Sequence, residues 1–369
     1  MYLKKIELKN FRNYEEEEIT FDNKINIISG KNAQGKTNLL ESLYIMSLGK
    51  SFRTNKDIEM IGFEKDYCRV KSTSVKEGRE LEIEINISRE GKSVKINGRK
   101  AERNIELLEN VYMVVFSPED MKIVKDEPEK RRRFIDRELC QLLPIYYKNL
   151  GRYKKILQQR NSLLKQQNIK VDVIEVWDEI LAECGAKIIQ ERGRFIEKLN
   201  ETSRNISKNI TNGKETMEIS YEPNIDKKDS LEEQKIHLRN QLSKNLKNDI
   251  FRGSTSVGPH KDDLNVCVEG IDIRRFGSQG QQRTAALSMK LAEIKIIKEE
   301  TGVLPILLLD DVLSELDEER QEFLIHSVNE VQVFITTTEI NDKLKAQLSA
   351  GEIFFAEKGK IIRLEKYSK

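Results

Sequence analysis

Hydrophobic and polar residues follow one another with two different periods along this chain, and the first of them predicts β-strands. Over residues 1–29 apolar side chains recur at short spacing, which predicts short strands that lead up to a glycine-rich stretch. From Tyr67 to Lys100 the period is clearly two, and Glu90-Gly91 and Asn97-Gly98 have the composition of tight turns. This second segment is therefore predicted to be an antiparallel β-meander.

From residue 126 onward the apolar residues recur in steps of three and four, which is typical of helices. Asp126-Glu127-Pro128 has the composition of a helix start. Pro144 should divide the pattern that follows into two helices, because a proline inside a helix costs about 3 kcal/mol. A further helical pattern extends from Ile174 to Phe195 and fades into polar residues near Ser207.

These patterns divide the chain into three parts. We interpret residues 126–214 as a helical arm inserted into an α/β head, whose two parts are residues 1–125 and 215–369. The arm is far too short for a long coiled coil. After it, Met217–Tyr221 is predicted to be a strand and Leu231–Ile250 a helix.

A polar cluster follows these elements, at Gly258-Pro259-His260-Lys261-Asp262-Asp263. Four ionisable groups in one turn could serve as a sensor or as a nucleic-acid contact. A tight structural turn explains the same residues equally well. The sequence leaves both interpretations open.

The stretch Gly30–Thr37 has the strongest chemical signal in the chain. It reads GKNAQGKT and fits G-x-x-x-x-G-K-[ST] at every fixed position, between an apolar run and an amphipathic one, so strand, loop and helix are predicted. Glycines let backbone N–H groups surround a polyphosphate at a positive helix N-terminus. Lys36 would place a charge on the outer phosphates, and Thr37 would offer a hydroxyl to Mg²⁺.

A second group of motifs lies near the C-terminus. Ser278–Gln281 is a Ser-x-Gly-Gln element that opens a predicted helix, so a hydroxyl and backbone donors lie at its positive end. The apolar run Ile306–Leu309 ends in Asp310-Asp311, which is the Walker B arrangement. There the first carboxylate, Asp310, is expected to hold Mg²⁺ with Thr37, and Asp311 to polarise the attacking water. The Ser-x-Leu-Asp element Ser314–Asp317 follows.

Global charge says little about partners, because 64 Lys and Arg nearly cancel 62 Asp and Glu in this chain of 369 residues. Local charge says more. Residues 121–170 contain fourteen Lys or Arg against five acids, which is a plausible footprint for a phosphate backbone. The DNA-binding candidates are Arg131, Arg132 and Arg133, although an ordinary solvated helix face would also account for the surplus.

Composition also indicates where in the cell the protein resides and argues against disulfide and zinc sites. Four isolated cysteines without a C-x-x-C, and only three histidines, argue against a disulfide framework or a zinc site and favour a reducing cytosol. The longest apolar run, Leu304–Leu309, is far shorter than the ~20 residues that span a bilayer. The N-terminus has charges where a signal peptide is apolar. We expect a cytoplasmic protein with no membrane partner.

Taken together, the motifs resemble the ATP-binding-cassette (ABC) ATPases, in particular the head domains of chromosome-maintenance proteins. The closer resemblance is to the RecF family of bacterial recombination and repair proteins, and it runs along the whole chain. It implies an α/β fold, an ABC-type P-loop ATPase head with a mixed sheet, an antiparallel β-meander and a short helical arm. The segments that carry it are Phe11–Tyr14, Gly30–Asn38, Phe116–Asp120, Gly258–Asp263, Ser278–Glu293, Leu307–Val312 and Ser314–Asp317.

The resemblance implies a mechanism in which two subunits enclose two ATP molecules. Carried over by position, Lys36 and Asp311 would be catalytic. Ser278, Gly280 and Gln281 would touch the γ-phosphate held by the partner subunit, and Asp317 would lie across the interface. The ATP-binding residues would be Gly30, Lys31, Asn32, Ala33, Gln34, Gly35, Lys36, Thr37 and Asn38.

Further expectations follow from the same resemblance. ATP, with Mg²⁺, would drive formation of a homodimer that closes on double-stranded or gapped DNA, and slow, DNA-stimulated hydrolysis would reopen it. RecR and RecO would be partners, with loading of RecA downstream, in replication, recombinational repair and the SOS response. Three departures from the wider cassette pattern point to feeble hydrolysis: threonines at 336–338 in place of a histidine, Asp311 in place of Glu, and no glutamine near Ser117–Glu119.

Three alternatives share part of the pattern. A transporter ATPase would have the same phosphate loop, the same Ser-x-Gly-Gln element (the signature element, Ser278–Gln281) and the same Walker B arrangement. The basic arm and the missing histidine argue against this class. A small-molecule kinase would share only Gly30–Thr37 and would leave Ser278 and Asp317 unexplained. A structural chromosome-organising protein needs long heptad arms, which this chain lacks.

Overall fold

The computed structural model describes residues 1–166, 171–340 and 350–368. The chain forms two compact units. The first, the head, comprises residues 1–122 and 286–369, and the second, the arm, comprises residues 123–285. No helix among the described residues is long and apolar enough to cross a membrane.

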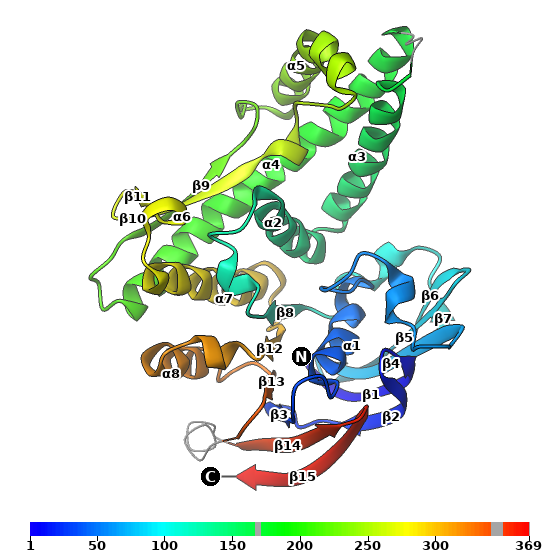
Figure 1. The fold of residues 1–369 in the computed structure, drawn as a ribbon, viewed down its shortest axis with the longest axis vertical. Helices are drawn as coiled ribbons and strands as arrows, with labels where there is room; N and C mark the ends of the chain where they lie inside the picture. Colours follow the sequence, from blue (N-terminus) through cyan, green and yellow to red (C-terminus); the bar gives the residue numbers. More distant parts are fainter. Residues whose placement is uncertain (167–170, 341–349, 369) are drawn as a thin grey trace. The chain divides into compact units, whose positions relative to one another are not determined.

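A six-stranded, mostly parallel sheet forms one layer of the head (Figure 1). Its strand order is β15-β14-β3-β13-β12-β8, and only β15 runs antiparallel to its neighbour. The interior strand β12 contains the wholly apolar run Ile306–Leu309, because side chains on both of its faces are buried. The bounds are β3 Ile25–Ser29, β8 Met113–Phe116, β12 Ile306–Asp310, β13 Val333–Thr337, β14 Ala350–Glu357 and β15 Lys360–Ser368.

The second layer of the head is an antiparallel sheet of order β2-β1-β4-β5-β6-β7. It contains the predicted meander, with turns at Glu90-Gly91 and Asn97-Gly98 as expected, and it adds the two N-terminal strands. The bounds are β1 Tyr2–Phe11, β2 Tyr14–Thr20, β4 Tyr67–Lys76, β5 Arg79–Ser88, β6 Gly91–Ile96 and β7 Arg99–Lys100.

The helix α1, Lys36–Leu48, contacts strands of both head sheets. Eleven of its thirteen residues are buried, so it has no solvated face of the kind that marks an amphipathic surface helix. This burial fixes the phosphate loop at the helix N-terminus against the core. The other helical segments of the head are residues 286–301 of α7 (Gln279–Thr301), α8 Glu318–Ser327 and short 3-10 turns at η1 Asp57–Met60, η2 Asn104–Leu107, η3 Asp120–Lys122 and η5 Val312–Glu315.

The arm is built on one 40-residue helix, α4, which is the long green helix of Figure 1. Pro144 separates α2 from α3 as predicted and is the first residue of α3. The helices α2, α3 and α5 pack on α4, as does β9, which is an edge strand of a three-stranded sheet of order β11-β10-β9. The bounds are α2 Pro128–Leu142, α3 Pro144–Leu163, α4 Val171–Ile210, β9 Met217–Glu222, α5 Leu231–Arg252, η4 Pro259–Lys261, β10 Asp263–Val268, β11 Ile271–Asp272, α6 Ile273–Phe276 and α7 Gln279–Thr301.

The arm extends further along the chain than the sequence patterns indicated. We expected it to end at residue 214, whereas residues 215–285 belong to the same compact unit and the boundary falls inside α7. The physical reason is that β9 packs on α4 and pairs with β10, so the apolar side chains of this sheet are buried against the arm helices. The strand at 217–222 and the helix at 231–252 are otherwise as predicted.

Two buried arginines join the arm's elements through carboxylates. Arg160, on α3, is fully buried and bonds Asp178 of α4 at 2.5 Å and Asp249 of α5 at 2.8 Å. Arg192, on α4, bonds Asp136 at 2.8 Å and Asp262 at 3.0 Å. Asp262 comes from the Gly258–Asp263 cluster, so this turn has a structural role at the arm's core.

Candidate functional site

The loop between β3 and α1 has the conformation that its glycines predict. Gly35 has φ +118°, and a Cβ there would lie 2.7 Å from Asn13 Nδ2, so only glycine fits without displacing a neighbour. The Lys36 side chain is 4% exposed, and its ammonium donates to the carbonyl of Gly30 at 2.7 Å and of Lys31 at 3.4 Å. A buried cation is therefore held directly over the loop.

The N-terminus of α1 favours an anion. Its N-cap, Gly35, provides no side-chain hydrogen bond, and no acidic residue lies in the first turn. The first-turn N–H groups and the positive end of the helix dipole thus face the loop without a built-in counter-charge. This combination with Lys36 can bind a phosphate group.

Polar side chains from the carboxyl ends of β12 and β13 and from the first turn of α1 meet beside the loop. The hydroxyls of Thr37 and Thr336 each donate to Asp310 Oδ1, both at 2.9 Å. They can meet because β13 lies between β3 and β12 in the sheet. Burial raises the pKa of Asp310, and the neighbouring Asp311 carboxylate raises it further, while the two hydroxyls oppose this.

The second Walker B carboxylate has an unusual backbone. Asp311 has φ +51°, a left-handed conformation that is uncommon outside glycine and is often found at functional sites. Its N–H donates to Thr336 Oγ1 at 2.9 Å, and its carboxylate lies 3.9 Å from the Lys36 ammonium. The structure thus brings Lys36, Thr37, Asp310 and Asp311 together.

The oxygen donors at this site suit Mg²⁺. A threonine hydroxyl and a buried carboxylate are hard ligands, and Mg²⁺ in proteins is commonly held by one or two such groups plus substrate phosphates and water. The Asp310 oxygen that Thr37 contacts is therefore a reasonable cation ligand. In the described part of the chain, no group of three or more His, Cys, Asp or Glu is arranged to hold a metal ion, so Mg²⁺ here would depend on Thr37, Asp310 and phosphate oxygens.

Two hairpin turns hold the outer side of the loop, and motif reasoning did not foresee this. Asn13, between β1 and β2, donates to the Gln34 carbonyl at 3.1 Å, and the Tyr14 hydroxyl donates to the Gly35 carbonyl at 3.0 Å. From the β14–β15 turn, the Lys358 N–H donates to Gln34 Oε1 at 2.7 Å. The segment Phe11–Tyr14 carried part of the resemblance, but its contact with the loop depends on tertiary structure.

Two arginines outside α1, Arg12 and Arg53, both donate to the carboxylate of Glu41 on α1, which is fully buried. Arg12 forms two hydrogen bonds with this carboxylate, at 2.9 and 2.7 Å. Arg53 also donates to Asn38 Oδ1 at 2.7 Å, so these arginines support the first turns of α1.

The Ser-x-Gly-Gln element opens α7 as predicted, and it belongs to the arm unit. The Gln281 N–H donates to Ser278 Oγ at 3.1 Å, and the Ser278 N–H donates to Gln281 Oε1 at 3.0 Å, which is a reciprocal N-terminal cap. Gly280 lies in the same turn. The Gln281 amide also donates to Glu215 Oε1 at 2.9 Å.

Asp317 is the N-cap of α8, in the head. Its carboxylate accepts a hydrogen bond from the Arg320 N–H at 3.0 Å and forms an ion pair with the Arg320 side chain. The side chain remains 53% exposed. It is thus positioned by a local capping interaction at the surface of the head.

The three DNA-binding candidates differ in accessibility, and Arg131 must be withdrawn. Arg131 is only 2% exposed, and its guanidinium pairs with both oxygens of Asp263, at 2.6 and 2.8 Å. Arg132 is half-buried and donates to the Asp262 carbonyl. Arg133 is exposed. Moving Arg131 to a phosphate would leave Asp263 without its bidentate partner.

Part of the exposed positive charge of the arm lies on α3, within the segment whose basic surplus the sequence showed. Lys148, Arg152 and Lys155 follow one another at steps of four and three and are exposed, so they share one face of the helix. Lys154 and Lys165 are exposed nearby. Some of this charge is offset, because Arg152 lies 3.8 Å from Glu183. Lys170, which was part of the basic surplus, lies outside the described residues.

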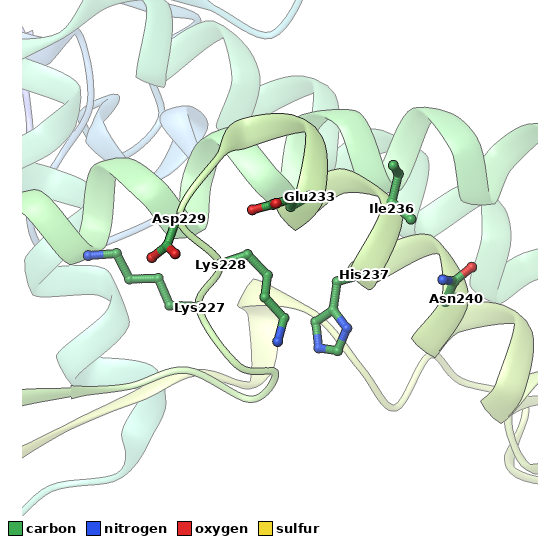
Figure 2. A pocket seen from close by; sticks show the side chains of 7 residues that line it. All are labelled: Lys227, Lys228, Asp229, Glu233, Ile236, His237 and Asn240. Atoms are coloured by element: carbon green, nitrogen blue, oxygen red, sulfur yellow. The ribbon is translucent and has the colours of Figure 1, made fainter.

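A shallow groove of about 520 Å³ runs beside the start of α5 in the arm (Figure 2). Figure 2 labels the side chains that line it: Lys227, Lys228 and Asp229 come from the loop before α5, and Glu233, Ile236, His237 and Asn240 come from α5. Lys227 pairs with Glu197 at 2.8 Å. Because acidic and basic groups balance along its walls, the groove does not favour a charged ligand of either sign.

Known proteins resemble the whole chain. The family described as RecF/RecN/SMC N terminal domain matches residues 2–361. A protein named DNA replication and repair protein RecF from Clostridium botulinum (strain ATCC 19397 / Type A) is 44% identical over 367 residues, which is 99% of this chain and 100% of that protein. The protein of the same name from Alkaliphilus oremlandii (strain OhILAs) is 45% identical over 365 residues, covering 98% of this chain and 100% of its own.

Solved structures agree with this. Two structures of the recombination mediator protein RecF in the RecFOR pathway, one with ATPγS and one with ATP, have TM-scores of 0.91 and 0.90. They are 37% and 38% identical to this chain and cover 99% of it and 98% of their own length. An Smc head bound to the winged-helix domain of ScpA shares the fold, with a TM-score of 0.56, 18% identity, and coverage of 99% of this chain and 98% of its own. The predicted ABC-type head fold is confirmed, and the chain belongs to the RecF family within the RecF/RecN/SMC group of ATPases.

Proposed function

We propose that this protein is an ATP-dependent DNA-binding protein of recombinational repair and replication, in which ATP joins two copies into a clamp on DNA. The observation that carries the proposal is the convergence of Lys36, Thr37, Asp310 and Asp311 beside the positive end of α1. Relatives named for DNA replication and repair, and RecF structures with ATP, support the choice of nucleotide and pathway.

In each subunit the loop Gly30–Asn38 would bind the phosphates of ATP through its backbone N–H groups. Lys36 would release the carbonyls of the loop and pair with the outer phosphates. Thr37 and Asp310 would hold Mg²⁺, which neutralises phosphate charge. Asp311, held by Thr336, would orient the attacking water.

The γ-phosphate would be shared between subunits. Ser278, Gly280 and Gln281 of one copy would contact the γ-phosphate bound by the other, with Asp317 near the same interface. ADP lacks this group and would not form the bridge. If each site contributes about 2 kcal/mol, two sites shift the monomer–dimer equilibrium on the order of several hundredfold.

The DNA ligand would be double-stranded or gapped, and the revised footprint is the exposed face of α3 together with Arg133. RecR and RecO would be the partners, with RecA loading downstream, since RecF relatives are described in the RecFOR pathway. We place the protein in the cytoplasm. Asp311 in the place of Glu and the threonines at 336–338 in the place of histidine favour slow hydrolysis that resets the clamp.

The proposal is tested by the mass of the full-length protein in sedimentation velocity with ATP, with ADP and without nucleotide. ATP alone should give a dimer. Ser278→Arg should bind ATP as tightly as the unmodified protein and remain a monomer, because the bulky side chain blocks only the in-trans contact.

Lys36→Ala is the complementary variant. It should lose both nucleotide binding and pairing, since Lys36 acts within the same subunit. An equal mass of the unmodified protein with every nucleotide would refute ATP-dependent dimerisation. Loss of ATP affinity in Ser278→Arg would refute the proposal that Ser278 contacts the ATP bound by the other subunit.

A further inference from the structure

The contacts of the signature element suggest a control on its availability. We infer that Glu215 is an anionic placeholder that occupies this element in the single subunit and must be displaced by the partner's γ-phosphate. Glu215 would thereby raise the ATP level needed for pairing. The inference rests on the proposed ATP-dependent dimer.

The polar groups expected to contact the γ-phosphate are engaged inside the subunit. Ser278 Oγ accepts from the Gln281 N–H at 3.1 Å, and Gln281 Oε1 accepts from the Ser278 N–H at 3.0 Å. The remaining donor of Gln281, its Nε2, bonds Glu215 Oε1 at 2.9 Å. A phosphate that approaches Gln281 therefore competes with a carboxylate already bonded there.

Glu215 is held in place by its neighbours in the chain. The next residue, Thr216, receives a hydrogen bond from the Glu269 N–H at 3.0 Å and donates its own N–H to the Glu269 carboxylate. Met217, which starts β9, is fully buried. The carboxylate is thus presented to α7 from the end of a paired strand.

The charge of Glu215 suits this position. The first turn of α7, a 23-residue helix, contains no acidic residue of its own, so a carboxylate from another element supplies the negative charge that the helix N-terminus favours. Before it displaces that carboxylate, a γ-phosphate oxygen that approaches Gln281 Nε2 would come within roughly 5 Å of it, because two hydrogen bonds from one amide nitrogen diverge by about 120°. At this distance two anions repel each other strongly enough to alter the pairing equilibrium.

The consequence is a threshold for pairing. Contact with the signature element would be favourable only for a group that carries more negative charge than a carboxylate, which the γ-phosphate does. ADP offers no such group to the partner, so the placeholder would remain. Removal of the carboxylate should ease pairing with ATP and leave the behaviour with ADP unchanged.

The test uses Glu215→Gln, which keeps a hydrogen-bond acceptor without the charge, and Glu215→Ala, which removes both. Dimerisation of the full chain is followed by sedimentation at fixed protein concentration while ATP or ADP is titrated with Mg²⁺. The favourable interaction of a carboxylate with a helix N-terminus changes an equilibrium constant by about 1.7- to 5-fold. Because two sites square this factor, we expect the dimerisation constant with ATP to rise about three- to thirtyfold.

Glu218→Gln is the matched control, since Glu218 is an exposed carboxylate three residues further along, on β9. It should pair as the unmodified protein does. Unchanged or weakened pairing in both Glu215 variants would overturn the inference while leaving the ATP-dependent dimer intact. An equal gain in Glu218→Gln would also overturn it, because the effect would then be one of net charge. If the unmodified protein does not pair with ATP, the proposed function fails and the inference falls with it.

Discussion

At the residue scale, the end of β12 carries two adjacent carboxylates with different surroundings. Asp310 is buried and accepts two threonine hydroxyls, whereas Asp311 is about one-third exposed and lies near Lys36. Burial raises the pKa of Asp310, so its charged form is less stable in the folded protein than in water. Such a cost is often found where a site binds a cation.

We predict that Asp310→Asn stabilises the nucleotide-free protein by about 1 kcal/mol, because the amide keeps an oxygen acceptor for Thr37 and Thr336 without a buried charge. The same change should weaken Mg²⁺-dependent ATP binding by at least about tenfold. Urea denaturation and titration with a fluorescent ATP analogue measure the two effects. Asp66→Asn, at an exposed site, should change neither. Unaltered Mg²⁺–ATP affinity would contradict the assignment of Asp310.

His260 is the second residue whose environment decides its chemistry. Its Nδ1 lies 2.7 Å from the Tyr153 hydroxyl and its Nε2 lies 3.0 Å from the Thr255 carbonyl. Desolvation lowers the pKa of this imidazole from 6.5 to about 4. The residue therefore serves the arm's core in the neutral form.

The sign of the pH effect follows from this. Between pH 6.5 and 4 the unfolded chain binds a proton at His260 that the folded protein does not, so the free energy of unfolding should fall by about 3 kcal/mol as pH drops across this window. Above pH 6.5 this contribution is constant. In urea melts at several pH values in this window, the free energy of unfolding of His260→Gln should change less with pH than that of the unmodified protein. His326→Gln, at an exposed site, should keep the pH dependence of the unmodified protein.

At the scale of elements, the phosphate loop is held by the β1–β2 and β14–β15 turns, which come from opposite ends of the chain. Gly359 has φ +72°, and a Cβ there would lie 2.1 Å from the Asn13 carbonyl oxygen. The Gly359 N–H also lies 3.3 Å from the Gln34 carbonyl. The two turns thus meet each other as well as the loop.

We predict that Gly359→Ala lowers ATP affinity by about tenfold, because the added methyl must push the Asn13 turn away from Gln34. Gly78→Ala is the matched control: Gly78 is also a hairpin glycine, with φ +76°, but a Cβ there meets nothing within 4 Å. Both variants should lose about 1 kcal/mol of stability from left-handed strain, and Gly359→Ala should lose more, because its Cβ also overlaps the Asn13 carbonyl oxygen. Equal ATP affinities in the two, measured by calorimetry, would show that the turn does not position the loop.

At the scale of the whole molecule, function depends on where uncompensated charge is displayed. The net charge of the chain is +2. Several basic residues of the arm are buried in internal ion pairs such as Arg131–Asp263 and Arg160–Asp249, and are not available to a ligand. The exposed face of α3 keeps Lys148, Arg152 and Lys155 at the surface. A DNA backbone would be attracted to this face.

We predict that replacing these three residues of α3 by Glu weakens DNA binding and reduces the salt dependence by about one unit per lost phosphate contact. Fluorescence anisotropy with duplex and gapped oligonucleotides at several salt concentrations measures both. The matched control reverses Lys198, Arg204 and Lys208, three exposed residues of α4. An unchanged salt slope in the α3 variant would place the DNA footprint elsewhere.

The sequence by itself determined the elements whose cause is local. The phosphate loop, the Pro144 break, the hairpin turns and the Ser278 cap depend on backbone conformations and hydrogen bonds within a few residues, so their spacing reveals them. The strands β3 and β12 were recognisable as apolar runs, because burial on both faces leaves little polar alternation. The motifs that carry the family resemblance are of this local kind.

Only the tertiary structure decided which charges remain available and what supports the site. Arg131 pairs with Asp263, 132 residues away, and the Lys358 N–H reaches Gln34 across 324 residues. Residues 215–285 belong to the arm because β9 pairs with β10 and packs on α4. Solvation and ion pairing depend on neighbours brought together by folding, and a pattern along the chain contains no information on those distances.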